Sequence, residues 1–116
     1  MKVADLAIIT PTLNEEHYIG KLLDSIIAQS IQPKDIIIVD AFSKDNTIRE
    51  IKKRQKKLPQ LRFYQIPQDT IAKQRNLGAK KTAIQHLLFL DADMQLLDPQ
   101  TLEIYMNEVE IKKPDI

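Results

Sequence analysis

The sequence predicts one α/β domain over residues 1–116, in which a mostly parallel β-sheet of about four strands is covered by helices on both faces. Short apolar runs rich in isoleucine, leucine and valine alternate with longer stretches whose apolar residues recur at helical spacing. The chain shows no internal repeat and no linker-like tract, and its length is near the commonest size of a single domain. Right-handed crossovers between parallel strands then give a doubly wound, Rossmann-like layout.

The first strand is predicted at residues 6–10 (LAIIT), where an apolar run ends at Pro11. A helix follows, because the next apolar residues keep the spacing of one helical face: Ile19, Leu22, Leu23, Ile26 and Ile27. Asn14 is a candidate N-cap of this helix. Glu15 and Glu16 favour the positive end of its dipole.

The second and third strands are predicted at residues 36–40 (IIIVD) and 62–66 (RFYQI), and the third has the weaker apolar pattern. A helix is predicted between them, with Ile48 and Ile51 on its apolar side. Three residues before this helix are candidate N-caps: Ser43, Asp45 and Asn46.

A third helix is predicted over residues 70–83, and its packing face is expected to consist of small residues: Ala72, Ala79 and Ala83. Gly78 lies inside this helix and weakens the pattern. The fourth strand is predicted at residues 87–91 (LLFLD), where the apolar run indicates a buried strand. Asp98 and Pro99 mark the start of a last helix. Its expected core face is Leu102, Tyr105, Met106 and Val109.

Composition excludes several classes of protein. The 17 basic and 16 acidic residues leave a net charge of +1, so no global field attracts nucleic acid. The absence of cysteine excludes disulfides and thiolate metal sites, and only two glycines argue against a glycine-rich phosphate loop. The basic run at residues 52–57 (KKRQKK) is expected to be a solvated helix face, because few aromatic residues are present to stack bases. We expect a cytoplasmic protein, with peripheral contact at the cytoplasmic membrane face as the alternative role of this run.

Polar residues follow three predicted strands at the same end. Asp40 ends the second strand, Asp91 and Asp93 end the fourth, and residues 11–15 follow the first. The carboxyl ends of parallel strands meet at one edge of a sheet, where ligands of such folds bind. Carboxylate oxygens suit Mg²⁺, which often completes its coordination shell with phosphate oxygens. A polar turn at Asp91 and Asp93 and a capping role for Asp40 remain the alternatives.

Four segments occur in one characteristic order and spacing over roughly residues 6–95: IITPTLNEEHYIGKLLDSIIAQS, DIIIVDAFSKDNT, AKQRNLGAKKTA and LLFLDADMQ. Together they resemble the N-terminal, nucleotide-sugar-binding half of an inverting family-2 glycosyltransferase of the GT-A fold. The resemblance implies a nucleotide-diphosphate-sugar as donor, with a UDP-sugar the first choice, and Mg²⁺ or Mn²⁺ as cofactor.

The resemblance assigns contacts with the donor nucleotide to matching positions of this sequence: Pro11, Thr12, Leu13, Glu15, Asp40, Arg75, Asp91 and Ala92. It assigns the metal ion to Asp93, the expected direct ligand, and to Asp91. Asp40 matches the aspartate that helps to hold the base or ribose, and Arg75 matches an arginine near the donor.

Two departures from the family pattern concern the base. Ala41 follows Asp40 where many members have a second aspartate, and Leu13 stands where the nucleotide loop often has an aromatic residue. These two departures predict a weaker contact with the base near Asp40 and weaker stacking of the base on the loop after the first strand.

The implied reaction transfers a sugar to an acceptor hydroxyl with inversion and releases a nucleoside diphosphate. Family members carry the catalytic base and the acceptor site in their second half, so both are expected beyond Ile116 and the chain is expected to be a donor-binding fragment. The acceptor is unspecified: a saccharide, a lipid-linked sugar or a protein. A homodimer formed through an exposed sheet edge and a missing C-terminal half both remain open. The alternative function is a non-catalytic nucleotide-sugar-binding or interaction module that lacks the base.

Overall fold

All four strands of the sheet are parallel. In the computed structural model, which describes residues 2–112, the strands lie in the order β3-β2-β1-β4. The strands are Lys2–Thr12 (β1), Ile31–Asp40 (β2), Leu61–Gln65 (β3) and Leu87–Phe89 (β4). A helix follows each strand: Ile19–Ile27 (α1), Thr47–Arg54 (α2), Ile71–Lys80 (α3) and Thr101–Lys112 (α4). The predicted doubly wound α/β fold is confirmed.

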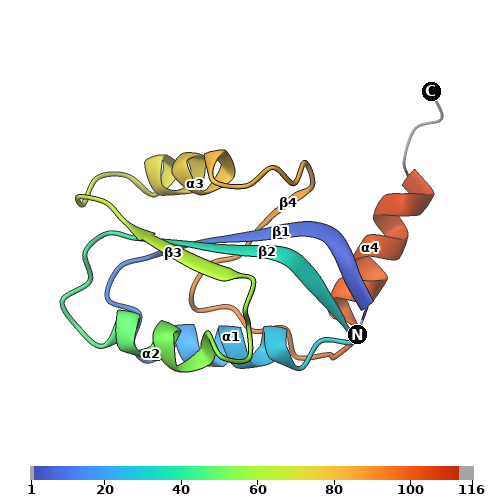
Figure 1. Ribbon diagram of the computed structural model, residues 1–116, viewed down its shortest axis with the longest axis horizontal. Coiled ribbons are helices and arrows are strands. Elements are labelled where there is room, and N and C mark those ends of the chain that lie inside the picture. Colours follow the sequence, from blue (N-terminus) through green and yellow to red (C-terminus); the bar gives the residue numbers. More distant parts are fainter. Residues whose placement is uncertain (1, 113–116) are drawn as a thin grey trace.

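Helices cover both faces of the sheet, with α1 and α2 on one face and α3 on the other (Figure 1). Successive residues of a strand point to opposite faces, so β1 supplies Ile8 to one core and Ile9 to the other. The larger core joins the sheet to α1, α2 and, through Leu102, to α4. The smaller core joins Ile9, Ile37 and Val39 to α3. Burial on both faces explains the continuous apolar runs of β1 and β2.

Three strands differ from the sequence-based prediction. β1 covers Lys2–Thr12 rather than residues 6–10, so Pro11 lies inside the strand and does not end it. β2 begins at Ile31 rather than at Ile36, because residues 31–33 pair with Lys2–Ala4 at the start of β1. β4 is an edge strand of only three residues, not a buried strand, and Phe89 is 42% exposed. Within residues 2–112, β4 has β1 as its one neighbour, which an apolar run alone does not reveal.

The start of α1 also differs from the prediction. The helix begins at Ile19 with Tyr18 at the N-cap position, so Asn14 is not its cap. Asn14 instead has a φ of 54°, which asparagine tolerates better than most residues, and its side-chain oxygen accepts a hydrogen bond from the Lys44 backbone N–H at 2.9 Å. Asn14 thus connects two loops rather than starting a helix.

The starts of α2 and α4 lie close to their predicted positions. Asn46 occupies the N-cap of α2 without a capping bond from its side chain. The neighbouring Asp45 carboxylate accepts from the Thr47 backbone N–H at 2.9 Å instead. In α4, the Thr101 hydroxyl donates to the backbone carbonyl of Asp98 at 2.8 Å. The predicted core face of α4 is confirmed as buried or half-buried.

α3 faces the sheet through buried Gln74 and Gly78, and of the three predicted alanines Ala79 alone packs against the smaller core. Ala72 is exposed, and Ala83 is exposed and lies beyond the end of the helix. A Cβ atom at position 78 would stand 2.5 Å from Cγ2 of Ile9. Glycine therefore lets α3 approach β1 more closely than any other residue would.

We expect Gly78→Ala to destabilise the protein by about 1–2 kcal/mol, because overpacking against buried Ile9 outweighs the gain in helix propensity. Denaturant unfolding measures this loss of unfolding free energy. Asn76→Ala, an exposed position of the same helix, is the matched control and should slightly raise stability. An increase with Gly78→Ala equal to that of the control would show that the approach of α3 to β1 is not tight.

Candidate functional site

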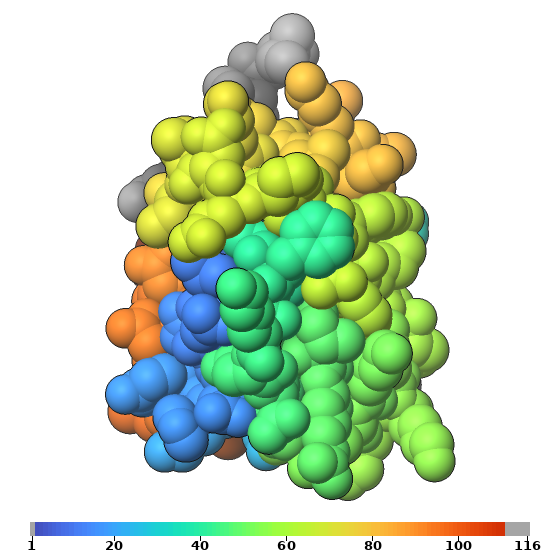
Figure 2. Space-filling view, turned by 90° about the vertical axis from the view of Figure 1, so that its left-hand side faces the viewer, coloured from blue at the N-terminus to red at the C-terminus, as the bar shows by residue number. Residues whose placement is uncertain are grey.

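The segments that follow β1, β2 and β4 meet at one edge of the sheet. Thr12, the last residue of β1, pairs with Asp40, the last residue of β2. On the other side of β1, the Leu90 backbone N–H donates to the Ile9 carbonyl at 3.1 Å, so Asp91 follows at the same edge. Figure 2 faces this edge and shows the blue, teal and orange segments after β1, β2 and β4 gathered beneath the yellow start of α3. We call this surface the carboxyl edge.

Asp40 is fully buried, and its carboxylate accepts four hydrogen bonds. Oδ1 accepts from the Thr12 hydroxyl at 2.7 Å and from the Ser43 hydroxyl. Oδ2 accepts from the Ser43 backbone N–H at 2.8 Å and from Nε2 of Gln65 at 3.2 Å. These donors replace the water that a buried charge loses, and they fill about four acceptor positions of the carboxylate. The predicted contact of Asp40 with base or ribose therefore requires one of these bonds to open.

The loops after β1 and β2 are fastened to each other by backbone-to-hydroxyl bonds. The Asn14 N–H donates to Oγ of Ser43 at 2.8 Å, and the Glu15 N–H donates to Oγ1 of Thr47 at 2.7 Å. The hydroxyl partners lie 29 and 32 residues further along the chain. These bonds hold both loops in a fixed arrangement before any ligand binds.

The residues predicted to wrap the nucleotide differ in their access to solvent. Pro11 and Thr12 are the last residues of β1 and are buried. Leu13 and Glu15 are half-buried, so their side chains are the ones that reach the surface of the carboxyl edge.

Asp91 begins a turn that follows β4, and Asp93 lies within this turn. The Met94 backbone N–H donates to the Asp91 carbonyl at 3.0 Å and closes the turn. Ala92, between the two aspartates, is buried in the larger core, whereas both carboxylates are exposed. Exposed and buried residues thus alternate along this turn. Ala92 packs in the core and holds the turn in place, while the side chains of Asp91 and Asp93 lie outside the core.

Arg75 brings the start of α3 to the same edge. Its Nη2 donates to Oδ1 of Asp91 at 3.0 Å, with the two side chains 41% and 60% exposed. The preceding residue, Gln74, is buried, and its Nε2 donates to the carbonyls of Thr12 at 3.1 Å and Val39 at 2.8 Å. Gln74 therefore holds α3 over the ends of β1 and β2 and positions Arg75. Sequence reasoning missed Gln74, because its partners lie far away in the chain.

Negative charge is concentrated around Glu15. Burial raises the pKa of Glu15 above its ordinary value of 4.5, and the nearby carboxylates of Asp93, Asp45 and Asp91 raise it further. The carboxyl edge therefore carries a negative potential that a cation would relieve.

The acidic side chains at this edge suit a cation that arrives together with phosphate oxygens. Residues 2–112 contain no group of three or more His, Asp or Glu side chains arranged to hold a metal ion alone. Mg²⁺ is commonly held by one or two carboxylates together with waters and substrate phosphates. Asp91 and Asp93, both exposed and close to Glu15, fit that smaller set of ligands.

We expect Glu15→Gln to raise stability at pH 7, where the folded protein holds a carboxylate whose pKa has been raised. A raised folded-state pKa means that the folded state binds the proton more tightly, so wild-type stability falls as pH rises from 4.5 through the folded-state pKa. The advantage of the Gln variant should therefore shrink toward zero as pH falls below 4.5. Urea unfolding at several pH values measures it, and a constant difference across this range contradicts the assignment.

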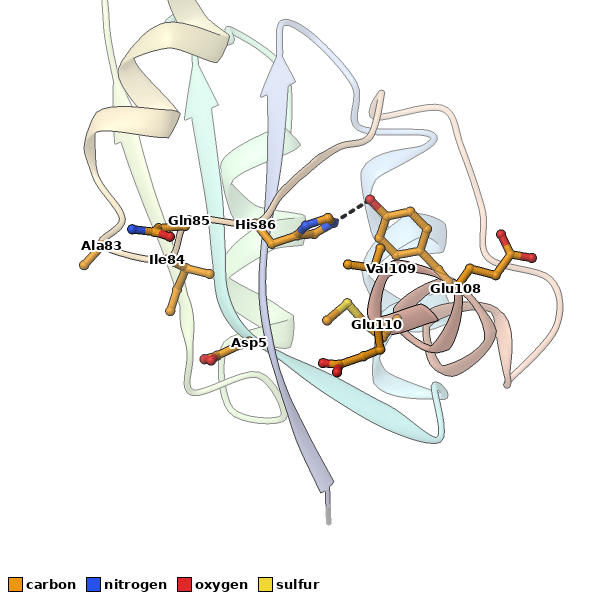
Figure 3. Close-up of a pocket in the computed structure, with 10 residues that line it drawn as sticks. Asp5, Ala83, Ile84, Gln85, His86, Glu108, Val109 and Glu110 are labelled. Carbon is orange, nitrogen blue, oxygen red and sulfur yellow. Dashed lines mark hydrogen bonds between the residues drawn. The ribbon is translucent and has the colours of Figure 1, made fainter. Parts of the chain in front are cut away.

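A cavity of about 850 Å³ lies away from the carboxyl edge, between the segment before β4 and α4 (Figure 3). It contains none of the predicted site residues. Nε2 of His86 and the Tyr105 hydroxyl are 2.7 Å apart and share a hydrogen bond across one side of it.

Among residues 2–112, no helix has the length and apolar character needed to cross a bilayer.

Comparison with known proteins identifies the family. The sequence model of "Glycosyl transferase family 2" matches residues 7–116. The poly(ribitol-phosphate) β-N-acetylglucosaminyltransferase TarS of Staphylococcus aureus is 32% identical over 102 residues, which are 84% of this chain and 17% of that protein. The hyaluronan synthase of Pasteurella multocida is 27% identical over 107 residues, which are 92% of this chain and 11% of that protein. The chain thus spans less than a fifth of the length of these curated relatives.

Solved structures share the fold. S. aureus TarS 1–349 in complex with UDP-GlcNAc superimposes with a TM-score of 0.82 and 30% identity over 96% of this chain and 32% of that chain. The mannosyltransferase PcManGT of Pyrobaculum calidifontis, solved with GDP-Man and Mn²⁺, superimposes with a TM-score of 0.80 at 22% identity over 97% of this chain and 33% of that chain. These similarities confirm the GT-A fold, and with the family match they show that the chain belongs to glycosyl transferase family 2.

Proposed function

We propose that this chain binds the nucleotide-sugar donor of a metal-dependent, inverting glycosyltransferase. The observation that carries the proposal is the meeting of Arg75 with Asp91, next to Asp93 and Glu15, at the carboxyl edge. Support comes from TarS, which has the same fold at 30% identity and was solved with UDP and with UDP-GlcNAc. Membership in a family of transferases favours this function over a non-catalytic binding module.

The proposal gives each group at the edge a task. Asp93, with Asp91, would hold Mg²⁺ or Mn²⁺ against the diphosphate, and a bound metal ion supplies electrostatic stabilisation of the charge that develops there. Arg75 would donate to a phosphate oxygen while keeping or exchanging its bond to Asp91. Leu13 and Glu15 would border the nucleotide. In this arrangement a UDP-sugar is the first choice of donor.

The reaction forms one bond and breaks another at the anomeric carbon of the sugar. The acceptor hydroxyl attacks that carbon, its proton passes to a base, and the bond to the diphosphate breaks with the electron pair leaving on the diphosphate oxygen. The residues described at the carboxyl edge serve the leaving diphosphate. The identity of the base, the acceptor and the oligomeric state stay predictions.

Arg75→Gln tests the proposed site. We expect wild-type protein to bind UDP in the presence of Mn²⁺, and the variant to bind it about tenfold more weakly or worse, because a charged donor to phosphate is lost. Isothermal titration calorimetry measures both dissociation constants, with GDP and CDP as alternative ligands. Arg49→Gln, which removes an exposed arginine of α2, is the matched control and should bind as wild type does. Equal affinity of the wild type and both variants for UDP would show that Arg75 does not contact the bound nucleotide.

A further inference from the structure

Phe42 has an unfavourable backbone conformation and an exposed ring. Its φ is 48°, in the left-handed region, and the residue is 53% exposed. Within residues 2–112, Asn14 is the other non-glycine residue with positive φ, and it has a short polar side chain that accepts a hydrogen bond. Phe42 has no such compensation, since its ring is apolar and large. Strained residues of this kind persist where the surrounding structure over-determines them, and they cluster at ligand-binding sites.

The neighbours of Phe42 on both sides fix this conformation. The Ala41 backbone N–H donates to the Thr12 carbonyl at 3.0 Å. The Ser43 backbone N–H donates to Oδ2 of buried Asp40 at 2.8 Å. Because both bonds end on the last residues of β1 and β2, the backbone of Phe42 is fastened to the carboxyl edge. The teal segment that contains residue 42 lies on this surface, between the blue segment after β1 and the yellow-green segment after β3 (Figure 2).

We propose that the ring of Phe42 is the stacking platform for the nucleobase of the donor. The proposal rests on the proposed function. Asp40 has its acceptor positions filled by Thr12, Ser43 and Gln65, so it has none free for a base. Leu13 is aliphatic and half-buried, so it offers no aromatic face. Phe42 stands two residues after Asp40, in the segment fastened to the carboxyl edge, and it is an exposed aromatic residue.

Stacking on an aromatic ring depends little on which base is present, because every base has a π-face. Phe42 would therefore contribute affinity for the nucleoside part of the donor and none for its diphosphate. It would set where the base lies and leave the choice among bases to other groups. This separation of base and diphosphate makes the proposal testable with two ligands.

The test compares UDP with inorganic pyrophosphate, each with Mn²⁺, on wild-type protein and on Phe42→Ala. We expect the variant to bind UDP roughly tenfold more weakly and pyrophosphate within about twofold of wild type. Phe42→Tyr should restore UDP affinity, and Ile104→Ala, which removes an equally exposed apolar side chain on α4, should not change it. Unchanged UDP affinity in Phe42→Ala, or equal loss for both ligands, overturns the proposal. Failure of the wild type to bind UDP, GDP or CDP instead rejects the proposed function and this inference with it.

Phe42→Gly separates stacking from any structural role of the ring. Glycine adopts a positive φ without strain, so this variant should melt a few degrees above Phe42→Ala. Both variants lack the ring, so both should bind UDP equally weakly. If the Gly variant instead recovers UDP affinity along with melting temperature, the conformation of the loop and not the ring sets the affinity, which overturns the proposal.

Discussion

Asp40→Ala should lower the free energy of unfolding by about 3 kcal/mol or more, the largest effect of any single substitution at the carboxyl edge. The substitution leaves four hydrogen-bond donors without their acceptor, two of them hydroxyls from Thr12 and Ser43. Each buried donor that loses its partner costs about 1–3 kcal/mol, less where water enters the space. The total free energy of unfolding of a small domain is only about 5–15 kcal/mol, so the loss expected for Asp40→Ala is a substantial part of it.

Urea unfolding monitored by circular dichroism measures this loss. Asp5→Ala is the matched control, because Asp5 is 83% exposed and has a single long contact of 3.6 Å with Lys34. The control should change stability by less than about 0.5 kcal/mol. A loss below about 1 kcal/mol for Asp40→Ala would mean that this carboxylate is not the anchor of the two loops.

Asp93→Ala should abolish the stabilisation that UDP gives in the presence of Mn²⁺. For the wild type, UDP at 100 times its dissociation constant stabilises the protein by about 2.7 kcal/mol, which for a chain of this size raises the melting temperature by roughly 10 °C. The variant should lose this increase, because the expected direct ligand of the cation is gone. Its own melting temperature without ligand should hardly change, because Asp93 is exposed and is repelled by Glu15.

Thermal melting with and without UDP, Mn²⁺ and both together measures this effect, and Asp5→Ala is again the control. The combination of UDP and Mn²⁺ should stabilise the control as much as the wild type. Retention of the full Mn²⁺-dependent increase in Asp93→Ala would contradict the assignment of this residue. An increase with UDP alone, equal to that with both, would contradict metal dependence.

The sequence predicts the parts of the fold that rest on hydrophobic periodicity. The spacing of Ile19, Leu22 and Ile26 gave the buried face of α1, and the run at residues 36–40 gave the central part of β2. Both patterns report burial directly, because a residue's place on a helix or strand decides which face it lies on. The parallel direction of the strands then follows from the alternation of strands and helices along the chain.

The errors arise where the structure depends on distant partners. The burial of β4 depends on its place at the edge of the sheet, and strand order is not encoded in the run at residues 87–91. α3 packs through Gln74 and Gly78, a polar residue and a glycine, since one bonds to distant carbonyls and the other makes room for Ile9. A pattern search for apolar residues cannot find such contacts.

The candidate site shows the same division. The sequence predicts that Asp40 and Asp91 end up at one edge, because both follow parallel strands, and the structure places them there. It does not predict that Asp40 is enclosed by hydrogen bonds, since Ser43 is local to it but Thr12 and Gln65 are not. Nor does it single out Phe42, whose exposure and positive φ are properties of the folded loop.

The most direct test is the anomalous diffraction of Mn²⁺ in a crystal of the protein grown with UDP. We expect one strong Mn²⁺ peak at coordination distance, roughly 2–2.3 Å, from a carboxylate oxygen of Asp93, Asp91 or both, with the diphosphate of UDP as its other ligand. We expect the uracil ring to lie on the face of Phe42. A Mn²⁺ peak remote from both aspartates, or UDP bound in the cavity between residues 83–86 and α4, would contradict the central claim that the carboxyl edge holds the donor.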